Sequence, residues 1–120
     1  MSLKFSRSRR LLNRSDFRAI YREGRKFIGK RLVLFYSTPL SSRTRLGITI
    51  TKKWGKAHDR NRFKRVSREG FRRRYPLLPQ GLDIDIRPRE GYRDLTPEAV
   101  AVELENFTLH IEKIQRRIER

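Results

Sequence analysis

The residues from 56 to 74 are of types that bind phosphate groups. This stretch, KAHDRNRFKRVSREGFRRR, holds nine Lys and Arg residues and only two acids, Asp59 and Glu69. Nine like charges on one short segment repel each other and cost folding free energy, unless a partner outside the chain neutralises them. The planar guanidinium group of arginine binds phosphate oxygens in pairs. The stretch therefore predicts contact with the backbone of a nucleic acid.

A single helix would place these charges in a row. Over residues 57–74 basic side chains recur at every fourth position, so they form a ridge about 18 Å long at about 1.5 Å per residue. This cationic ridge consists of Arg60, Lys64, Arg68 and Arg72, with Asn61 and Arg65 beside it. The apolar positions of the same helix predict an underside that packs on a sheet: Ala57, Phe63, Val66, Gly70 and Phe71.

A solvated helix face is the alternative interpretation of such a run of charges. Solvated faces usually mix charges of both signs, whereas residues 52–74 carry eleven basic and two acidic side chains. We therefore predict a nucleic-acid surface at this helix. Its expected members are Lys52, Lys53, Lys56, Arg60, Asn61, Arg62, Lys64, Arg65, Arg68 and Arg72.

Length and composition limit the classes of protein to which the chain can belong. With 120 residues it has room for one domain, and its net charge of +18 lies in two segments, residues 1–31 and 52–74, which carry +9 each. The sequence has no cysteine and two histidines, which excludes a disulfide framework and a cysteine nucleophile. It shows no apolar window long enough to span a membrane and no secretory signal, so it predicts a cytoplasmic protein.

The N-terminal half predicts a basic, partly flexible arm over residues 1–12, then a helix and two strands. The helix in NRSDFRAIYREG is capped by Asn13 or Ser15 and ends at Gly24. The strands are RLVLFYST, which runs up to Pro39, and RLGITIT, with room for an extra short strand near residues 25–29.

The C-terminal half predicts one strand and one long helix. In LDIDIR the apolar side chains lie on one face, and the pair Asp83 and Asp85 lies on the other, where we expect exposure to solvent. The helix is capped by Thr96 and carries one apolar stripe, made of Val100, Leu104, Phe107, Ile111, Ile114 and Ile118. The order helix, strand, strand, helix, strand, helix predicts a single α+β domain of two layers.

The string RNRFKRVSRE at residues 60–69 resembles the arginine-asparagine-arginine signature of the protein subunit of bacterial ribonuclease P. As in that family, a strand ending in TKK and a short GKA loop precede it. The resemblance extends over about residues 7–115 and includes LLNRSDFRAIYREGR, LVLFY, RLGITIT and LPQGLDIDIRPR. The residues that depart from the family pattern are Trp54, His58, Asp59, Gly70 and Asp85. Gly70, where alanine is more usual, is expected to weaken its helix by up to about 1 kcal/mol.

The resemblance implies an RNA-binding subunit that assists a catalytic RNA in removing the 5′ leader of precursor tRNA. In this family the RNA performs the hydrolysis with Mg²⁺ that the RNA mainly holds, so no catalytic residue, metal site or cofactor is expected in the chain itself. The implied partners are the catalytic RNA and the 5′ leader, with no membrane and no obligate protein partner. The implied fold is a small sandwich with a mixed sheet and a left-handed βαβ crossover through the basic helix.

The family holds the leader in a cleft between the first helix and the sheet. In this sequence Phe17 and Tyr21 are one helical turn apart, and with Tyr36 from the strand they can form a platform on which unpaired bases stack. Core packing is the alternative interpretation of these aromatic residues. We assign Thr49 to the same cleft, and Ile20 and Phe35 to the core.

Two other functions are open to a chain of this kind. A nuclease active without RNA is not expected, because the sequence shows no nucleophile paired with a base, and His58 and His110 belong to different elements. A ribosomal or other structural nucleic-acid-binding protein without a role in tRNA processing is the second alternative. A reader of duplex grooves needs a helix and a turn before its recognition helix, whereas a strand precedes residues 57–74 here.

Overall fold

The computed structural model of the chain describes residues 13–38 and 43–119. The predicted arm over residues 1–12 and the centre of the loop over 39–42 lie outside the described residues. The described elements, in chain order, are α2 (Arg14–Glu23), β1 (Arg25–Ile28), β2 (Leu32–Ser37), β3 (Arg45–Ile48), η1 (Lys52–Trp54), α3 (Ala57–Arg74), η2 (Tyr75–Leu77), β4 (Asp83–Pro88), η3 (Tyr92–Asp94) and α4 (Pro97–Glu119).

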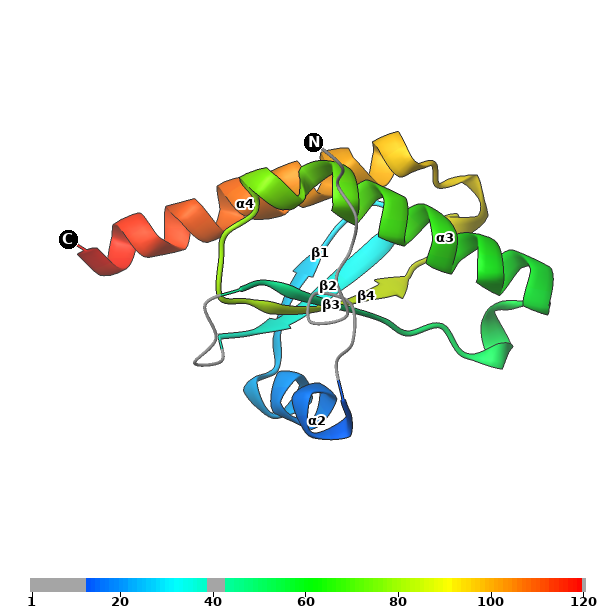
Figure 1. Cartoon of the computed structure of the whole chain (residues 1–120), viewed down its shortest axis with the longest axis horizontal. Coiled ribbons are helices and arrows are strands. Elements are labelled where there is room, and N and C mark those ends of the chain that lie inside the picture. The colour runs from blue at the N-terminus through cyan, green and yellow to red at the C-terminus, as the bar shows by residue number, and fades with distance from the viewer. Residues whose placement is uncertain (1–12, 39–42, 120) are drawn as a thin grey trace.

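The four strands form one mixed sheet in the order β1-β2-β4-β3. The pairs β1–β2 and β2–β4 are antiparallel, and β3 lies parallel to β4. Helix α3 connects β3 to β4 and packs with α4 on one face of the sheet, while α2 lies on the opposite face (Figure 1). The predicted α+β fold, the extra strand near residues 25–29 and the crossover through the basic helix are confirmed.

Local sequence signals fix the ends of α2. The side chain of Asn13 accepts a hydrogen bond from the backbone N–H of Asp16, and the Asp16 carboxylate accepts one from the N–H of Asn13. Asn13 is therefore the N-cap, of the two residues that the sequence allowed. Gly24 ends the helix with a φ of 65°, a left-handed conformation that glycine adopts without strain. Ile20 is fully buried under α2.

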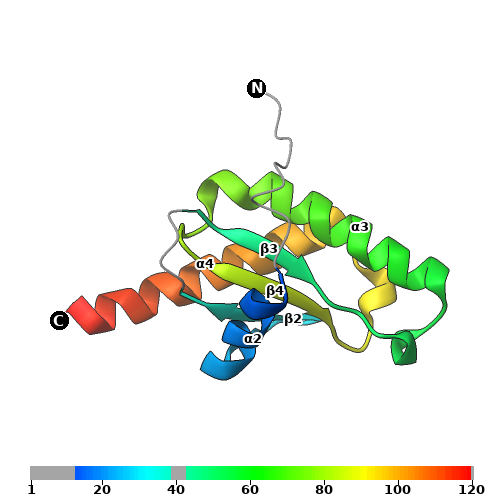
Figure 2. The same ribbon diagram turned by 60° about the horizontal axis from the view of Figure 1, so that its bottom comes forward.

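The main hydrophobic core lies between the sheet and the helices α3 and α4. Helix α4 begins at Thr96, whose hydroxyl accepts a hydrogen bond from the N–H of Ala99 at 3.1 Å. The first four residues of its predicted stripe are buried, namely Val100, Leu104, Phe107 and Ile111. The stripe then continues past the sheet, because α4 extends beyond the strands (Figure 2), and the side chain of Ile118 is 77% exposed.

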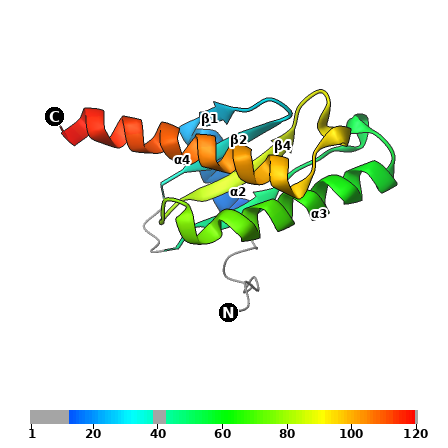
Figure 3. The ribbon, with the colours of Figure 1, turned by 90° about the horizontal axis from the view of Figure 1, so that it is seen from above.

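Gly70 lies at a close contact between α3 and α4. The two helices run side by side over the sheet (Figure 3). A Cβ atom at position 70 would lie 2.5 Å from the Cβ of Val100 and 2.8 Å from the carbonyl oxygen of Pro97. Real Cβ atoms do not approach other atoms so closely, so only glycine fits at this contact. The intrinsic cost of glycine in a helix is therefore offset by the packing of α3 on α4.

We expect Gly70→Ala to lower the free energy of unfolding by about 2 kcal/mol, although alanine is the better helix former. The added methyl group has to push α4 away, and one atom in its path belongs to the backbone of Pro97. Urea unfolding of the variant measures this change. Adding Val100→Ala should recover part of the loss, so that the double variant is more stable than the two single losses predict. A more stable Gly70→Ala variant would contradict the close contact.

Trp54 has a structural role at the start of α3. Its ring packs edge-on against Tyr92, at 5.8 Å between centroids, and Tyr92 packs in the same way against Phe63 at 5.7 Å. The Tyr92 hydroxyl also donates a hydrogen bond to the Trp54 carbonyl oxygen. This row of three rings connects η1, η3 and α3. The large side chain at position 54 thus fixes the loop that precedes the basic helix.

Candidate nucleic-acid interface

The cationic ridge exists as one row on α3, and its charges are free for an outside partner. Arg68 and Arg72 are exposed, and Arg60 and Lys64 at the flank of the helix are half-buried. Within residues 13–38 and 43–119, no carboxylate forms an ion pair with any of the four. Asn61 and Arg65 beside the ridge are also exposed. The predicted arrangement is therefore present, and its contact with RNA stays a prediction.

The opposite flank of α3 is occupied by contacts within the chain. Arg62 donates a hydrogen bond to the carbonyl oxygen of Arg93 at 2.9 Å, and Arg93 forms an ion pair with Asp59 at 3.2 Å. Arg73 pairs with Glu98 of α4 at 2.6 Å. Arg62, which the signature string grouped with the RNA contacts, therefore lies apart from the ridge and helps to hold α3 against η3. A helix places residues 60 and 62 about 200° apart, which separates the two roles.

Three lysines lie at the N-terminal end of α3, as the sequence predicted. Lys52, Lys53 and Lys56 are all exposed, and the loop that carries them is fixed by Arg60, whose Nε donates a hydrogen bond to the Gly55 carbonyl oxygen at 3.2 Å. Lys53 also lines a cleft on the α2 face of the sheet. The ridge and the cleft thus meet at η1.

The cleft is a half-open cavity of about 270 Å³ on the face of the sheet that carries α2. Its floor comes from β2, β4 and the segment that follows β3, and its end from the segment around η1. Val33 and Phe35 lie on one side and Thr49 on the other. The full lining is Val33, Phe35, Thr49, Thr51, Lys53, Trp54, Arg87 and Pro88. Its mixture of a cation, an aromatic ring and hydroxyl groups suits an unpaired nucleotide.

Two aromatic rings and an arginine contact one another at the α2 side of this cleft. The rings of Tyr21 and Phe35 lie 6.3 Å apart at 60°. The guanidinium carbon of Arg87 lies 4.4 Å from the centre of the Tyr21 ring and 4.7 Å from that of Phe35. Tyr21 is 45% exposed, and Phe17 on the same side of α2 is half-buried. Tyr21 thus contacts Phe35 and Arg87, two residues of the cleft lining that also includes Thr49. The joint role of Phe17, Tyr21 and Thr49 in leader binding stays a prediction.

Tyr36 does not join this platform, so that assignment is wrong. Side chains alternate between the two faces of a strand, and Tyr36 points to the face that carries α4, where it is 5% exposed and packs edge-on against Phe107 at 5.2 Å. Burial raises the pKa of its hydroxyl. The neighbouring Phe35, which we assigned to the core, lies instead in the cleft. The roles that the sequence predicted for Phe35 and Tyr36 are therefore exchanged, because the two neighbouring side chains lie on opposite faces of β2.

Asp85 is buried beneath the cleft, which overturns the expectation that Asp83 and Asp85 face solvent. The Asp85 side chain is fully buried and accepts hydrogen bonds from the Thr49 hydroxyl at 2.9 and 3.1 Å and from Nε of Arg87 at 3.0 Å. Burial raises the pKa of the Asp85 carboxyl to about 7, although the hydrogen bond from Thr49 lowers it. Burial also lowers the pKa of Arg87.

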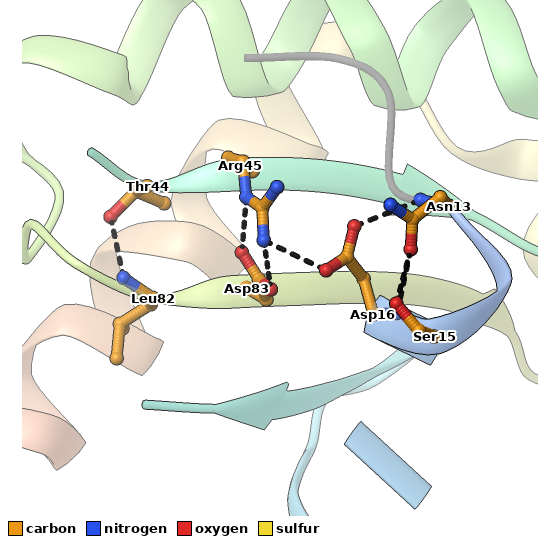
Figure 4. Close-up of polar contacts among 7 residues, drawn as sticks. All are labelled: Asn13, Ser15, Asp16, Thr44, Arg45, Leu82 and Asp83. Atoms are coloured by element: carbon orange, nitrogen blue, oxygen red, sulfur yellow. Dashed lines mark hydrogen bonds and ion pairs between the residues drawn. The ribbon is translucent and has the colours of Figure 1, made fainter. Parts of the chain in front are cut away.

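Asp83 is the second buried acid, and through Arg45 it is linked to α2. Arg45 of β3 donates to both oxygens of Asp83, from Nε at 2.8 Å and from Nη2 at 2.7 Å, and its Nη2 also contacts Asp16 of α2 at 3.0 Å (Figure 4). Arg45 therefore links two strands to the first turn of α2. This bridge could not be predicted from the sequence, because its three members are far apart along the chain.

The described part of the chain holds no group of three or more His, Asp or Glu residues placed to bind a metal ion. The two buried acids are instead engaged by arginines and by a hydroxyl group. Within the described residues no helix is sufficiently long and apolar to cross a membrane.

Comparison with known proteins gives one consistent result. The sequence matches the family model described as Ribonuclease P over residues 5–112. It is 39% identical over 90 residues to the ribonuclease P protein component of Thermotoga maritima, an alignment that covers 75% of the chain and 77% of that protein. It is 44% identical over 88 residues to the ribonuclease P protein component of Chlamydia trachomatis, with 72% of each protein covered.

Solved structures resemble the fold in the same way. The RNase P protein from Thermotoga maritima superimposes with a TM-score of 0.72 and 34% identity, covering 82% of the chain and 94% of that structure. A mutant RNase P protein from Staphylococcus aureus gives a TM-score of 0.71 and 30% identity, with 87% of each covered. The family match includes both the ridge on α3 and the cleft on the α2 face of the sheet.

Proposed function

This chain belongs to the ribonuclease P family, whose proteins act in tRNA processing, and from that premise we propose that its two surface features bind two different RNAs. The cationic ridge binds the catalytic RNA subunit of ribonuclease P. The cleft binds the single-stranded 5′ leader of precursor tRNA. The chain assists the endonucleolytic removal of that leader. A ribosomal role without tRNA processing is not favoured by the comparisons.

One observation carries this proposal: the unpaired cations of α3 adjoin a cleft that can stack bases. Lys53 lines the cleft, and Arg60 begins the ridge one turn into α3. Free cations bind phosphates and release counterions, whereas aromatic rings bind bases with little regard to sequence. A partner with folded RNA next to an unpaired strand fits both surfaces together. A precursor tRNA bound to a catalytic RNA is such a partner.

The chemistry itself is proposed to reside in the RNA. The described residues do not fit a magnesium site, since the buried carboxylates of Asp83 and Asp85 are already bound by arginines. Mg²⁺ is therefore assigned to the RNA partner, and no step is assigned to this chain through a metal. With both partners RNA molecules that are made and processed in the cytoplasm, the proposed location is cytoplasmic.

The proposal is tested by reconstitution. The purified chain is mixed with transcribed ribonuclease P RNA at near-physiological magnesium, and cleavage of precursor tRNA is measured. We expect the mixture to cleave at the 5′ end of the mature sequence, and the chain without RNA to cleave nothing. Leader removal by the protein alone would overturn the assignment of the chemistry to RNA, and no cleavage by the mixture would overturn the role as its subunit.

Replacing Phe35 with leucine is expected to weaken the binding of precursor tRNA to the holoenzyme about tenfold, because each lost base–aromatic stack costs about 1 to 3 kcal/mol. Binding of mature tRNA, which lacks the leader, should not change. Phe17→Leu should act in the same direction. Equilibrium binding of both RNAs to the reconstituted holoenzyme gives the comparison.

Tyr36→Leu provides the matched control from the opposite face of the same strand. Because Tyr36 packs on Phe107 in the core, its loss should lower the free energy of unfolding and affect both RNAs equally. If Phe35→Leu also affects both RNAs equally, or if Tyr36→Leu selectively weakens precursor binding, the cleft does not hold the leader as proposed.

A further inference from the structure

Arg87 is held in the cleft by contacts with residues of α2, β2 and β4. Its guanidinium group contacts Tyr21 from α2 and Phe35 from β2, two rings that come from different elements. The Arg87 side chain is 28% exposed, so part of the guanidinium plane faces the cavity that it lines. Its Nη atoms make no hydrogen bond or ion pair with any described residue. They are available to a ligand.

The carboxylate of Asp85 holds Arg87 in this position. An arginine side chain has four rotatable bonds, and ordering it costs conformational entropy. The hydrogen bond from Nε to Asp85 at 3.0 Å restrains the plane of the guanidinium group, and Asp85 itself is not part of the cavity lining. The Thr49 hydroxyl, also in the lining, is fixed by the same carboxylate at 2.9 Å. One buried acid thus orients two polar groups of the cleft.

A buried acid at this position costs folding free energy, and orienting the polar groups of the cleft is a use that explains it. Asp85 is fully buried in β4, and an apolar residue there would avoid the cost of removing a charge from water. The charges that face it are those of its own strand, Asp83 and Arg87, and Arg45 of β3, which is bound to Asp83. Its uncharged neighbours include Thr49, which donates a hydrogen bond to it, and Phe35, which lies opposite it on β2.

We propose that Asp85 is a positioning residue for leader binding, which holds Arg87 against Tyr21 and Phe35 so that the free side of the guanidinium group forms a stacking surface for an unpaired base. Base–arginine stacking is a common means of binding single-stranded RNA. The free Nη atoms then face the adjoining phosphate. This role rests on the proposed function of the cleft, and it adds a residue that never touches the RNA.

The test measures binding of precursor and mature tRNA to the reconstituted holoenzyme carrying Asp85→Leu, Arg87→Lys or both. Asp85→Leu should weaken precursor binding about fivefold and leave mature tRNA unchanged, because only the stacking surface is lost. Arg87→Lys keeps the charge but has no plane, and should cost as much. If Asp85 acts through Arg87, the double variant should be no weaker than Arg87→Lys alone. Under multiple turnover KM should rise for precursor while kcat is unchanged.

Two further variants keep the result interpretable. Asp85→Asn has the shape of the native side chain and one acceptor oxygen, so it replaces Asp85→Leu if leucine prevents folding. It should weaken precursor binding about threefold, and this effect should also vanish in the Arg87→Lys background. Asp94→Asn, in an exposed turn, controls for the loss of one negative charge. Trp54, the single tryptophan, lines the cleft and reports binding of a leader oligonucleotide by its fluorescence.

Independent, additive effects of the two substitutions, or equal effects on both RNAs, would assign Asp85 to the stability of the fold and overturn the proposal. Failure of the leader function itself gives a different pattern. In that case the wild-type holoenzyme binds precursor and mature tRNA equally, and Phe35→Leu changes neither. If the wild-type holoenzyme prefers precursor tRNA, and this preference is lost in Phe35→Leu but kept in Asp85→Leu, only the role of Asp85 is refuted.

Discussion

Replacing Arg60, Lys64 and Arg68 together with glutamine is expected to weaken binding of ribonuclease P RNA by about 100- to 1000-fold at about 0.1 M salt. The same variant should show a shallower dependence of affinity on salt, with the slope of log K against log[salt] reduced by about two to three units. Filter binding or fluorescence anisotropy over a series of salt concentrations measures both quantities.

The physical reason is counterion release. Each phosphate that a side chain neutralises releases condensed cations from the RNA, so three lost contacts remove about two to three units of slope. The three residues lie on one side of α3, and no carboxylate among the described residues competes for them. Arg60 alone makes a fixed contact within the chain, from Nε to Gly55, which leaves its terminal nitrogens for phosphate.

The chain offers a matched control on α4. The variant Lys113→Gln/Arg116→Gln/Arg117→Gln loses the same formal charge from exposed positions near the end of that helix. If α3 carries the interface, the control should keep most of the affinity and of the salt dependence. Equal losses in the two triple variants would mean that the RNA responds to net charge only, and the ridge would lose its assigned role.

The helices could be predicted from the sequence because their signals are local. Asn13 and Gly24 fix the ends of α2, Thr96 begins α4, and the charges of α3 recur every four residues. Each of these signals involves residues within one or two turns of each other. The position of the cationic ridge followed directly, since a helical period is sufficient to place Arg60 and Arg68 on one side.

The cleft could be predicted only in part, because strand β2 is apolar or aromatic at nearly every position. In LVLFYS the single polar residue, Ser37, stands at the last position of the strand and is itself buried, so the period of two has no clear phase. The choice between Phe35 and Tyr36 depends on the pairing of β2 with β4, where Phe35 lies opposite Asp85. A polar partner on the next strand was the available signal, and it points to Phe35.

The buried acids were missed for a related reason. Alternation in LDIDIR correctly places Asp83 and Asp85 on one face, but it cannot show that α2 covers that face. Their arginine partners come from β3 and from the end of β4. Gly70 is a similar case, since propensity alone describes its effect within α3 and leaves out its contact with Val100 of α4. Contacts between distant elements decide both.

The stability of the Asp85→Asn variant relative to the wild type is expected to rise with pH, by about 2 to 4 kcal/mol between about pH 4 and about pH 8. In the folded chain burial raises the pKa of Asp85 from 3.8 to about 7. Between these two values the folded chain binds more protons at Asp85 than the unfolded chain does. The contribution of Asp85 to the free energy of unfolding therefore falls as the pH rises through this window.

Asparagine does not ionise, so the stability of the variant does not fall with pH at this position. Near pH 4 the wild type should be the more stable of the two or equal to the variant, and near pH 8 the variant gains the difference. The contact of Asp85 with Arg87 at 3.0 Å favours the ionised form and makes the effect smaller than burial alone would give, which is why the expected range extends downward from about 4 kcal/mol.

Urea unfolding of both proteins at a series of pH values measures the difference, with Asp94→Asn as a control for the change in net charge. An NMR titration of the Asp85 carboxyl carbon gives the midpoint directly and should place it near the value set by burial. A difference in stability that stays constant across the series would show that Asp85 is ionised in the fold as readily as in the unfolded chain. The ion pair with Arg87 would then be strong enough to cancel the cost of burying the charge of Asp85, because no other arrangement of these groups gives that result.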